Sequence, residues 1–164
     1  VMLESMKLIV EQYPDAVLKF YGDGEDESYV KKLTNELGLV ENVCFMGYTS
    51  KTKEVINESE VFCLTSDYEG IPNTLIEAMS IGMPVVSTDC TPGGARLLIQ
   101  NNINGLLVER QKPKQIADAV CRLFSDDVLR IRMGNNALHI KKTFSEEKVF
   151  NEWKAYFNKI VNEQ

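Results

Sequence analysis

The sequence predicts an α/β fold in which a doubly wound, mainly parallel sheet is covered by helices on both faces. Three observations favour this fold class. Short apolar runs alternate with segments of helical periodicity along most of the 164 residues, which is the order that produces right-handed βαβ units. The apolar runs are continuous, as strands buried on both faces require. Glycine or proline stands at the ends of many segments, where the chain must turn.

The elements of the first half are predicted from apolar periodicity and from the residues that end them. Apolar residues recur at helical spacing from Met2 to Val10, and Pro14 closes that helix. The next strand ends in the turn Tyr21-Gly-Asp-Gly24, and the following helix stops at Gly38. In chain order, the predicted elements are helix 1–12, strand 16–21, helix 26–38, strand 43–46, helix 51–58 and strand 61–64.

The second half begins with a helix that has clear boundary signals. Pro72 is predicted at its first position and Gly82 just past its end, the usual asymmetry of helix termini. The last helix carries an apolar stripe, from Val149 to Ile160, that requires a partner. The predicted elements are helix 72–81, strand 84–87, helix 95–100, strand 105–108 and helices 113–124, 127–141 and 145–161.

The composition is that of one folded domain. Hydrophobic residues make up 44% of the chain, enough for a sizeable core. The 18 Lys and Arg are outnumbered by 24 Asp and Glu, and this acidic balance excludes general binding to nucleic acid, which needs a basic face. No apolar run approaches the roughly 20 residues of a membrane span, and no signal peptide opens the chain. We therefore expect a single cytoplasmic domain over residues 1–164.

The four cysteines are expected to be reduced and structural. Cys44, Cys63, Cys90 and Cys121 lie far apart in sequence, and His139, expected at the surface, is the one histidine. These spacings do not match a zinc site, and the chain contains no D-x-D motif, so no metal ligand is predicted. Each cysteine lies in or beside an apolar stretch, where buried free thiols are common.

The chain begins within a helix and not with a strand. In a doubly wound domain the first strand lies in the middle of the sheet. We therefore expect this domain to lack its first strand, either because the chain was cut from a longer polypeptide or because a leading segment is missing from the sequence.

The most informative segment is Asp67–Pro84, which follows a predicted strand to the carboxyl edge of the sheet, where open α/β folds bind ligands. Asn73 and Thr74 present free N–H groups at a helix N-terminus, which is a ready site for an anion. Glu69 precedes this helix. Glu77 lies five residues after Pro72, which is about 7.5 Å further along the helix axis. The two carboxylates could hold hydroxyl groups on either side of a diphosphate. They could equally be ordinary helix-flanking acids, and their spacing leaves both interpretations open.

This segment resembles the E-x7-E region of retaining glycosyltransferases of the GT-B fold, and glycosyltransferase family 4 most of all. The resemblance covers nearly the whole chain. It rests on six motifs in order: Tyr21-Gly-Asp-Gly24, Val43-Cys-Phe-Met-Gly47, Glu69-Gly-Ile-Pro72, Glu77-Ala-Met79, Gly82-Met-Pro-Val-Val86 and Asn104-Gly-Leu-Leu-Val108. The chain is thereby similar to the C-terminal, donor-binding domain of such an enzyme, the Rossmann-like half of the GT-B fold.

The resemblance implies a role for each carboxylate and for the residues between them. Glu69 matches the catalytic Glu that contacts hydroxyl groups of the donor sugar near the reaction centre. Glu77 matches the Glu that holds the ribose hydroxyls of the nucleotide. Backbone groups of four further residues would line the sugar and the diphosphate: Gly70, Ile71, Asn73 and Thr74.

The same resemblance places the nucleoside beside the loops that follow the first two strands. Gly22 and Gly24 belong to the loop beside the nucleotide, and the segment from Met46 to Tyr48 lies where the base docks, although Tyr48 is also consistent with an ordinary surface residue. Arg96 follows a Gly-Gly loop and either meets a phosphate or lies free at the surface. At the next position the family commonly has Glu, and this chain has Leu97.

The implied activity belongs to a longer enzyme. That hexosyltransferase would move a hexosyl unit from a UDP- or GDP-sugar to a saccharide or lipid-linked acceptor with retention, without a cofactor or a divalent metal. The setting would be surface polysaccharide or glycolipid assembly, with possible peripheral association at the cytoplasmic face of the membrane. The family's N-terminal acceptor domain, and an Arg and a Lys that hold the diphosphate, match nothing in this chain. The 164 residues alone are therefore expected to be inactive.

Two other functions are open to a chain of this kind. A Rossmann-like nucleotide-binding or regulatory module without catalysis would need no pair of carboxylates at this spacing. A non-hydrolysing nucleotide-sugar epimerase shares the GT-B fold but needs His and carboxylate groups for acid–base chemistry, and His139 is badly placed for that role.

Overall fold

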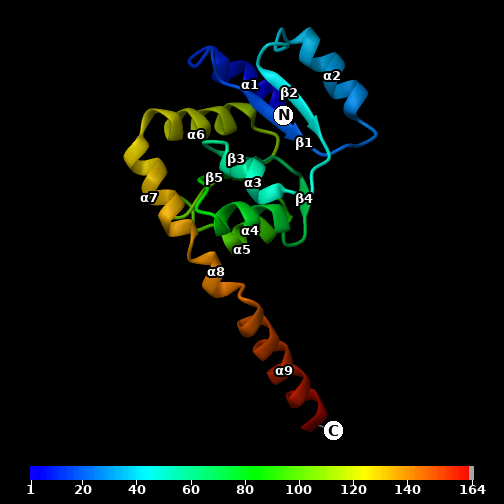
Figure 1. The fold of residues 1–164 in the computed structure, drawn as a ribbon, viewed down its shortest axis with the longest axis vertical. Helices are drawn as coiled ribbons and strands as arrows, with labels where there is room; N and C mark the ends of the chain where they lie inside the picture. Colours follow the sequence, from blue (N-terminus) through cyan, green and yellow to red (C-terminus); the bar gives the residue numbers. More distant parts are fainter. Residues whose placement is uncertain (163–164) are drawn as a thin grey trace.

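Helices and parallel strands alternate through the first 108 residues, and four helices follow (Figure 1). The computed structural model describes residues 1–162, so the last two residues of the predicted domain lie outside the described residues. The elements are α1 (Met2–Val10), β1 (Leu18–Tyr21), α2 (Glu27–Glu36), β2 (Val43–Gly47), α3 (Thr52–Asn57), β3 (Phe62–Leu64), β4 (Tyr68–Glu69), α4 (Asn73–Ser80), β5 (Val85–Thr88), β6 (Thr91–Pro92), α5 (Gly94–Leu98), β7 (Leu106–Val108), α6 (Pro113–Ser125), α7 (Asp127–Ala137), α8 (Ile140–Thr143) and α9 (Glu146–Asn162).

All strand pairs are parallel, as predicted for this α/β class, and each of the five predicted strands is present. Within residues 1–162, however, the strands form three hydrogen-bonded groups instead of one continuous sheet. β1 pairs with β2, β5 lies between β3 and β7, and β4 pairs with β6. The sequence did not indicate β4 and β6 because two residues are too few to show a periodic pattern.

One apolar core joins the two larger groups of strands. It combines residues of α1, α6 and α7 with Val43 of β2, Val86 of β5 and Leu106 of β7. The opposite face of β5 belongs to a second core, in which Val85 packs with Leu75 and other residues of α4 and α5. All four residues of β5 are buried. The sheet around β5 is therefore covered by helices on both faces, as the fold class requires.

Two helix boundaries differ from the prediction for local reasons. Pro72 is the N-cap of α4 and not its first helical residue, because its ψ of 108° is extended and its carbonyl accepts the N–H groups of Leu75 and Ile76. The predicted helix 127–141 is divided into α7 and α8, because the N–H of His139 turns back to the carbonyl of Asn136, three residues earlier. Gly82 has the positive φ expected just past the end of α4, 80°.

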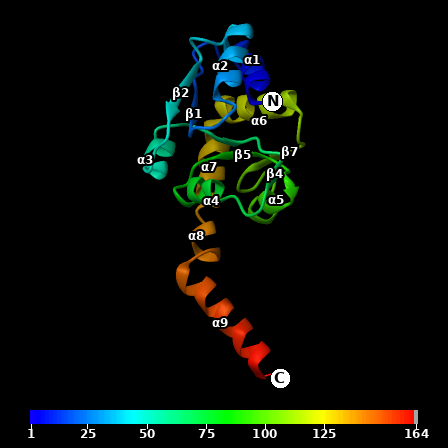
Figure 2. The ribbon, with the colours of Figure 1, turned by 90° about the vertical axis from the view of Figure 1, so that its right-hand side faces the viewer.

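The helix α9 extends away from the rest of the molecule (Figures 1 and 2). None of its described residues is buried. Its aromatic side chains pack on one another, with the Trp153 ring centroid 5.5 Å from that of Phe157 and 6.1 Å from that of Tyr156. The predicted apolar stripe is therefore present and solvent-exposed.

The cysteines are free, as predicted; Cys90 and Cys121 are buried, Cys63 is half-buried, and Cys44 is exposed. It follows the buried Val43 in β2, whose remaining residues are exposed or half-buried. Because successive side chains of a strand point to opposite faces, Cys44 lies on the outer face of β2. His139 is exposed, as predicted. None of the helices over residues 1–162 has the length and apolar character needed to cross a membrane.

Candidate functional site

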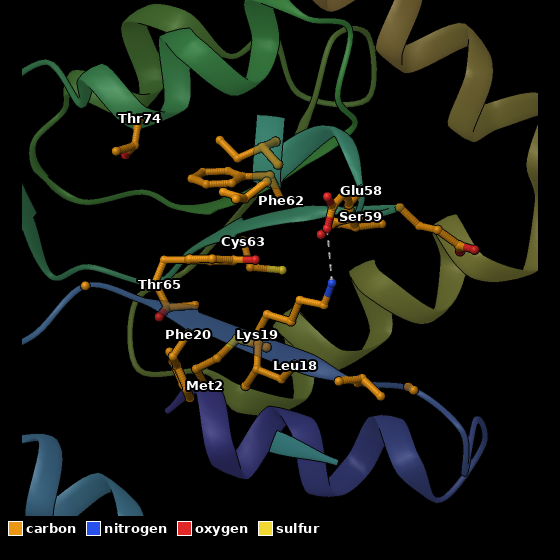
Figure 3. Close-up of a pocket in the computed structure, with 18 of the residues that line it drawn as sticks. Met2, Leu18, Lys19, Phe20, Glu58, Ser59, Phe62, Cys63, Thr65 and Thr74 are labelled. Carbon is orange, nitrogen blue, oxygen red and sulfur yellow. Dashed lines mark ion pairs between the residues drawn. The ribbon is translucent and has the colours of Figure 1, made fainter. Parts of the chain in front are cut away.

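The loops that follow the strands meet at one edge of the molecule, because the strands are parallel. A cavity of about 950 Å³ lies between β1 and β3 and reaches this carboxyl edge, where we call its end the mouth. Figure 3 shows Thr65, just after β3, and Thr74 of α4 among the side chains that line it. The mouth of the cavity is lined by Gly22, Tyr48, Thr49, Thr65 and Thr74.

The N-terminus of α4 lies at this same edge. The first two helical residues, Asn73 and Thr74, are exposed. The amides of Leu75 and Ile76 bond to the carbonyl of Pro72 at 3.1 and 3.2 Å, whereas the amides of Asn73 and Thr74 have no acceptor among the described residues. No acidic side chain lies in the first turn. The positive end of the helix dipole and two N–H groups are therefore available to an anion.

Glu77 lies on the same face of α4 as Asn73. The two residues are four positions apart, which places Glu77 about 6 Å further along the helix axis on one stripe of the surface. Leu75, Ala78 and Met79 form the buried face of the helix. The half-buried Glu77 carboxylate has no protein partner among residues 1–162, so it is available to donors of a bound ligand.

Glu69 is held in position before α4. It is the second residue of β4 and is half-buried. The hydroxyl of Ser66 donates a hydrogen bond of 2.8 Å to Glu69 Oε1. One carboxylate oxygen is thereby fixed by the protein, and the other has no protein donor in the described part of the chain.

The loop that carries Glu69 is joined to the loop after β5. The N–H of Thr91 bonds to the carbonyl of Asp67 at 3.0 Å, and Glu69 pairs with Pro92 across β4 and β6. A Cβ atom on Gly94 would lie 1.4 Å from the carbonyl oxygen of Gly70. The backbone of Gly70 thus rests directly on the start of α5. The Gly93-Gly94 pair was the one sequence signal for this contact.

A second cavity, of about 640 Å³ and lined mainly by polar residues, lies beside these two loops. Arg96 lines it and is ion-paired with Asp89, with Nε 3.0 Å from Oδ1. The hydrogen bond and the charge of Asp89 raise the pKa of the Arg96 guanidinium. Arg110 donates to the carbonyl of Asp67 at 3.3 Å, and Gln111 donates to the Asp67 carboxylate. Arg96 therefore lies at the surface and is held by a neighbouring carboxylate.

The structure brings together part of the predicted set. Gly22 and Tyr48 line the cavity mouth with Thr74, and the Gly22 N–H bonds to the carbonyl of Gly47 at 2.8 Å, which links the loops after β1 and β2. Gly24 lies in the loop after β1 and Met46 lies in β2, and neither residue lines either cavity. The remaining predicted residues form the loop and helix start on the other side of the mouth without lining either cavity: Glu69, Gly70, Ile71, Asn73 and Glu77.

Two residues of the mouth were not predicted. Thr49 and Thr65 line it from the loops after β2 and β3. For Thr65 the available signal was a polar side chain directly after an apolar strand, at the end where functional loops lie. In the described chain, no three His, Cys, Asp or Glu side chains are grouped so as to hold a metal ion.

Comparison with protein families identifies the domain. The family model "Glycosyl transferases group 1" matches residues 1–139. A poly(ribitol-phosphate) alpha-N-acetylglucosaminyltransferase of Staphylococcus aureus (strain COL) is 31% identical over 160 residues, which are 96% of this chain and 32% of the relative. A UDP-Gal:alpha-D-GlcNAc-diphosphoundecaprenol alpha-1,3-galactosyltransferase of Escherichia coli is 29% identical over 163 residues, 97% of this chain and 42% of the relative.

Solved structures show the same fold. A mutant of S. aureus TarM in complex with fondaparinux, alpha-GlcNAc-glycerol and UDP matches with a TM-score of 0.88 and 29% identity, over 95% of this chain and 32% of that one. Anabaena HepE in complex with UDP-glucose matches with a TM-score of 0.84 and 22% identity, over 96% and 44%. The predicted Rossmann-like half of a GT-B fold is thereby confirmed. The chain spans less than half the length of these relatives, and it belongs to the glycosyl transferases group 1 family.

Proposed function

We propose that the chain is the donor-binding domain of a hexosyltransferase that takes its sugar from a nucleoside diphosphate sugar. Among these donors we favour a UDP-sugar. The observation that carries the proposal is α4, where two free amides at the N-terminus precede a free carboxylate, Glu77, on the same face. A bound diphosphate and the ribose next to it need these groups in this order. The UDP in the TarM complex and the UDP-Gal in the name of the E. coli relative support the choice of base.

The N-terminus of α4 would hold the diphosphate. The amides of Asn73 and Thr74 would donate to phosphate oxygens, assisted by the helix dipole. When the bond between the sugar C1 and the diphosphate oxygen breaks, negative charge grows on the leaving group. Donors that already point at this position stabilise the transition state without reorganisation.

The nucleoside would lie between Glu77 and the cavity mouth. A carboxylate accepts two hydroxyl donors, so Glu77 is suited to the 2′- and 3′-hydroxyls of a ribose. Gly22 and Gly24 would allow close approach beside the nucleotide, and Met46 to Tyr48 would contact the base. With Tyr48 77% exposed and Met46 48% exposed, both side chains have apolar surface to cover.

Glu69 would act on the sugar, as the catalytic residue of this domain. The Ser66 hydroxyl bonds to Oε1 of Glu69, so Oε2 is left for a sugar hydroxyl. The bond between Oε2 and that hydroxyl would orient the sugar ring toward the acceptor. Gly70 and Ile71 would line the sugar with backbone groups. The acceptor oxygen forms its bond to C1 on the face from which the diphosphate leaves, so the anomeric configuration is retained.

The acceptor would be bound by a separate N-terminal domain of the same protein. We therefore expect this chain alone to bind donor and to transfer nothing. The acceptor would be a saccharide or a lipid-linked glycan in surface polysaccharide or glycolipid assembly, at the cytoplasmic face of the membrane. We expect transfer by the full-length protein to need no divalent metal and to be unchanged by EDTA.

Titration calorimetry with UDP, GDP and ADP tests the proposal on the chain and on the full-length polypeptide. UDP is expected to bind, and Glu77→Ala to weaken binding about ten- to a hundredfold, since a lost hydrogen bond to a charged group costs about 1.5–3 kcal/mol. Glu41→Ala is the matched control, because Glu41 is an exposed acid before β2, at the opposite edge of the sheet. Equal loss in both variants, or no binding of any nucleotide, would instead support a regulatory module without catalysis.

A further inference from the structure

The strand pair β4–β6, which carries Glu69, continues the strand pair β3–β5 in the same register. Leu64 of β3 pairs with Ser87 of β5, 23 positions later. Tyr68 of β4 pairs with Thr91 of β6, again 23 positions later. The two pairs are separated by an interruption of three residues in each segment. Glu69 therefore lies on an extension of the central sheet, beyond a break in its ladder of backbone hydrogen bonds.

Two hydrogen bonds cross this interruption. The Thr88 hydroxyl donates to the carbonyl of Ser66 at 2.5 Å, and lies 3.4 Å from the carbonyl of Leu64. The N–H of Thr91 donates to the carbonyl of Asp67 at 3.0 Å. A side chain of β5 thus supports the loop backbone where the regular ladder is broken.

Thr88 differs from the other buried polar side chains of residues 1–162, which are Ser5, Thr34 and Ser87. Each of those three bonds to a carbonyl at most four positions away in the sequence. Thr88 instead reaches a segment 22 positions earlier. It is 1% exposed, and a buried hydroxyl costs free energy unless it is hydrogen-bonded. The bond to Ser66 therefore accounts for a hydroxyl at this position of β5.

The side chain of Ser66 extends the connection to Glu69. Its hydroxyl donates to Glu69 Oε1 at 2.8 Å, and hydrogen bonds to an ionised acceptor are among the stronger ones in proteins. Thr88 thus holds the backbone of Ser66, and Ser66 holds the carboxylate of Glu69. The orientation of this carboxylate depends on a side chain in the interior of the sheet.

The loop after β7 provides a second anchor for the same segment. Gln111 donates to the carboxylate of Asp67, and Arg110 donates to the carbonyl of Asp67 at 3.3 Å. Gln111 has a φ of 56°, in the left-handed region that favours glycine. Such a conformation persists where the surrounding contacts hold it. At Gln111 that contact is the hydrogen bond to Asp67.

We propose that Thr88 and Gln111 are positioning residues for sugar transfer, which hold Ser66 and Asp67 and thereby aim Glu69 without touching the donor. This inference rests on the proposed function, because Glu69 is the residue assigned there to the donor sugar. A misplacement of about 1 Å near the reacting atoms can lower a rate about a hundredfold. Loss of either anchor is therefore expected to lower kcat, while the nucleotide remains bound at α4.

The reaction to measure is release of UDP from UDP-glucose and from UDP-N-acetylglucosamine by the full-length polypeptide, with water as the acceptor. The bond from the sugar C1 to the diphosphate oxygen breaks and its electron pair leaves with UDP. The water oxygen bonds to C1 and releases a proton to the solvent. KM for the donor, Kd for UDP and Tm are measured on the same samples.

Gln111→Gly tests the anchor at the surface. Glycine accepts the backbone angle, so Tm is expected to stay equal or to rise, whereas kcat is expected to fall by about threefold or more. Asn102→Gly is the matched control, because Asn102 has a similar φ of 65° and lies outside the loops of the candidate site; its kcat should not change. A purely structural role of Gln111 would lower kcat only together with Tm. Unchanged kcat in Gln111→Gly overturns the role of Gln111.

Thr88→Val tests the buried anchor, because it removes the hydroxyl and keeps the shape of the side chain. We expect kcat to fall about tenfold with KM and Kd changed by less than about threefold, and Thr88→Ser to retain the wild-type kcat. Ser87→Ala removes the neighbouring buried hydroxyl of β5 and is expected to retain it as well. Since Thr88 acts through Glu69, Thr88→Val should cost nothing further in a Glu69→Ala background. A further tenfold loss there, or an equal loss in Ser87→Ala, overturns the role of Thr88.

Crystal structures without a ligand separate failure of this inference from failure of the proposed function. Glu69 is expected to bond to Ser66 in the wild type and to take other orientations in Thr88→Val or Gln111→Gly. One unchanged orientation in both variants overturns the positioning role, whatever the rates are. If the wild type neither binds UDP nor releases it, while the variants displace Glu69, the proposed function fails and the two anchors of Glu69 stand.

Discussion

The two halves of the molecule use glycine in different ways. Around β3, β5 and β7, a Cβ atom added to any of three glycines would collide with another segment, at 1.4 Å for Gly94, 2.2 Å for Gly134 and 2.7 Å for Gly105. Around β1 and β2, no atom lies within 4 Å of the added Cβ at any glycine: Gly22, Gly24, Gly38 and Gly47. The half around β3, β5 and β7 is close-packed at these positions, whereas the glycines around β1 and β2 serve mainly the backbone angles of turns.

The strands show the same difference. Every residue of β5 is buried, and every residue of β1 is half-buried. The groups proposed for the diphosphate and the sugar lie on the close-packed half, on β4 and α4. The groups proposed for the nucleoside lie on the loosely packed half, beside the larger cavity. We infer that the diphosphate site is more rigid than the nucleoside site.

Gly94→Ala should show the largest effect on the close-packed half. The new methyl group collides with the carbonyl oxygen of Gly70, so either α5 or the loop after Glu69 must move. The free energy of unfolding, measured by urea denaturation, is expected to fall by more than about 4 kcal/mol. Gly24→Ala has open space and should change it by less than about 1 kcal/mol. Similar losses in the two variants would remove the distinction between the halves.

A pair of leucine truncations tests the same contrast with one kind of side chain. Leu75 of α4 has no exposed surface, and Leu18 of β1 is half-buried and lines the larger cavity. Leu75→Ala is expected to cost about 3 kcal/mol, because it leaves a cavity in a packed core. Leu18→Ala should cost about 1 kcal/mol, since less contact is lost. A larger loss for Leu18→Ala would contradict the account.

The smallest expected effect on stability comes from the ionisation of a cysteine thiol. Burial raises the pKa of the Cys63 thiol to about 12, against 9.0 for a free thiol. Between these values the unfolded chain releases a proton that the native chain keeps, so native stability falls as the pH rises above 9. Cys63→Ala should remove about 1 kcal/mol of the stability loss between pH 8 and pH 10.

The exposed thiol of Cys44 provides the control for this measurement. Urea midpoints at the two pH values are expected to show the full wild-type loss in Cys44→Ala and a reduced loss in Cys63→Ala. Identical pH dependence in the two variants would show that the Cys63 thiol is not buried in solution.

The sequence predicted the five longer strands because each carries a run of apolar residues buried by the sheet. It did not predict β4 and β6, whose pairing depends on a contact between Gly70 and Gly94 that are far apart in sequence. It placed Cys44 in the core because local composition does not show which face of an edge strand is covered. Glu69 and Glu77 were identified by motif resemblance, and the hydrogen bond from Ser66 to Glu69 became visible only with the fold.

Part of the candidate site was predictable, because local sequence patterns mark the boundaries of its helix. Helix boundary residues such as Gly82 indicated where α4 lies, so the exposed amides of Asn73 and Thr74 followed from the sequence. Thr49 lines the cavity mouth because two loops meet there, and no local pattern encodes that meeting. The larger cavity, whose lining residues come from distant parts of the chain, appears only in the structure.

The central claim, that a nucleoside diphosphate binds across the N-terminus of α4 and the mouth of the cavity, is tested most directly by mapping backbone amide chemical shifts during titration with UDP. The account predicts that the largest shifts fall on Asn73, Thr74 and Gly22, and that the amides of α9 do not change. Largest shifts on α9 or at the second cavity around Arg96, or no shifts at saturating UDP, would contradict it.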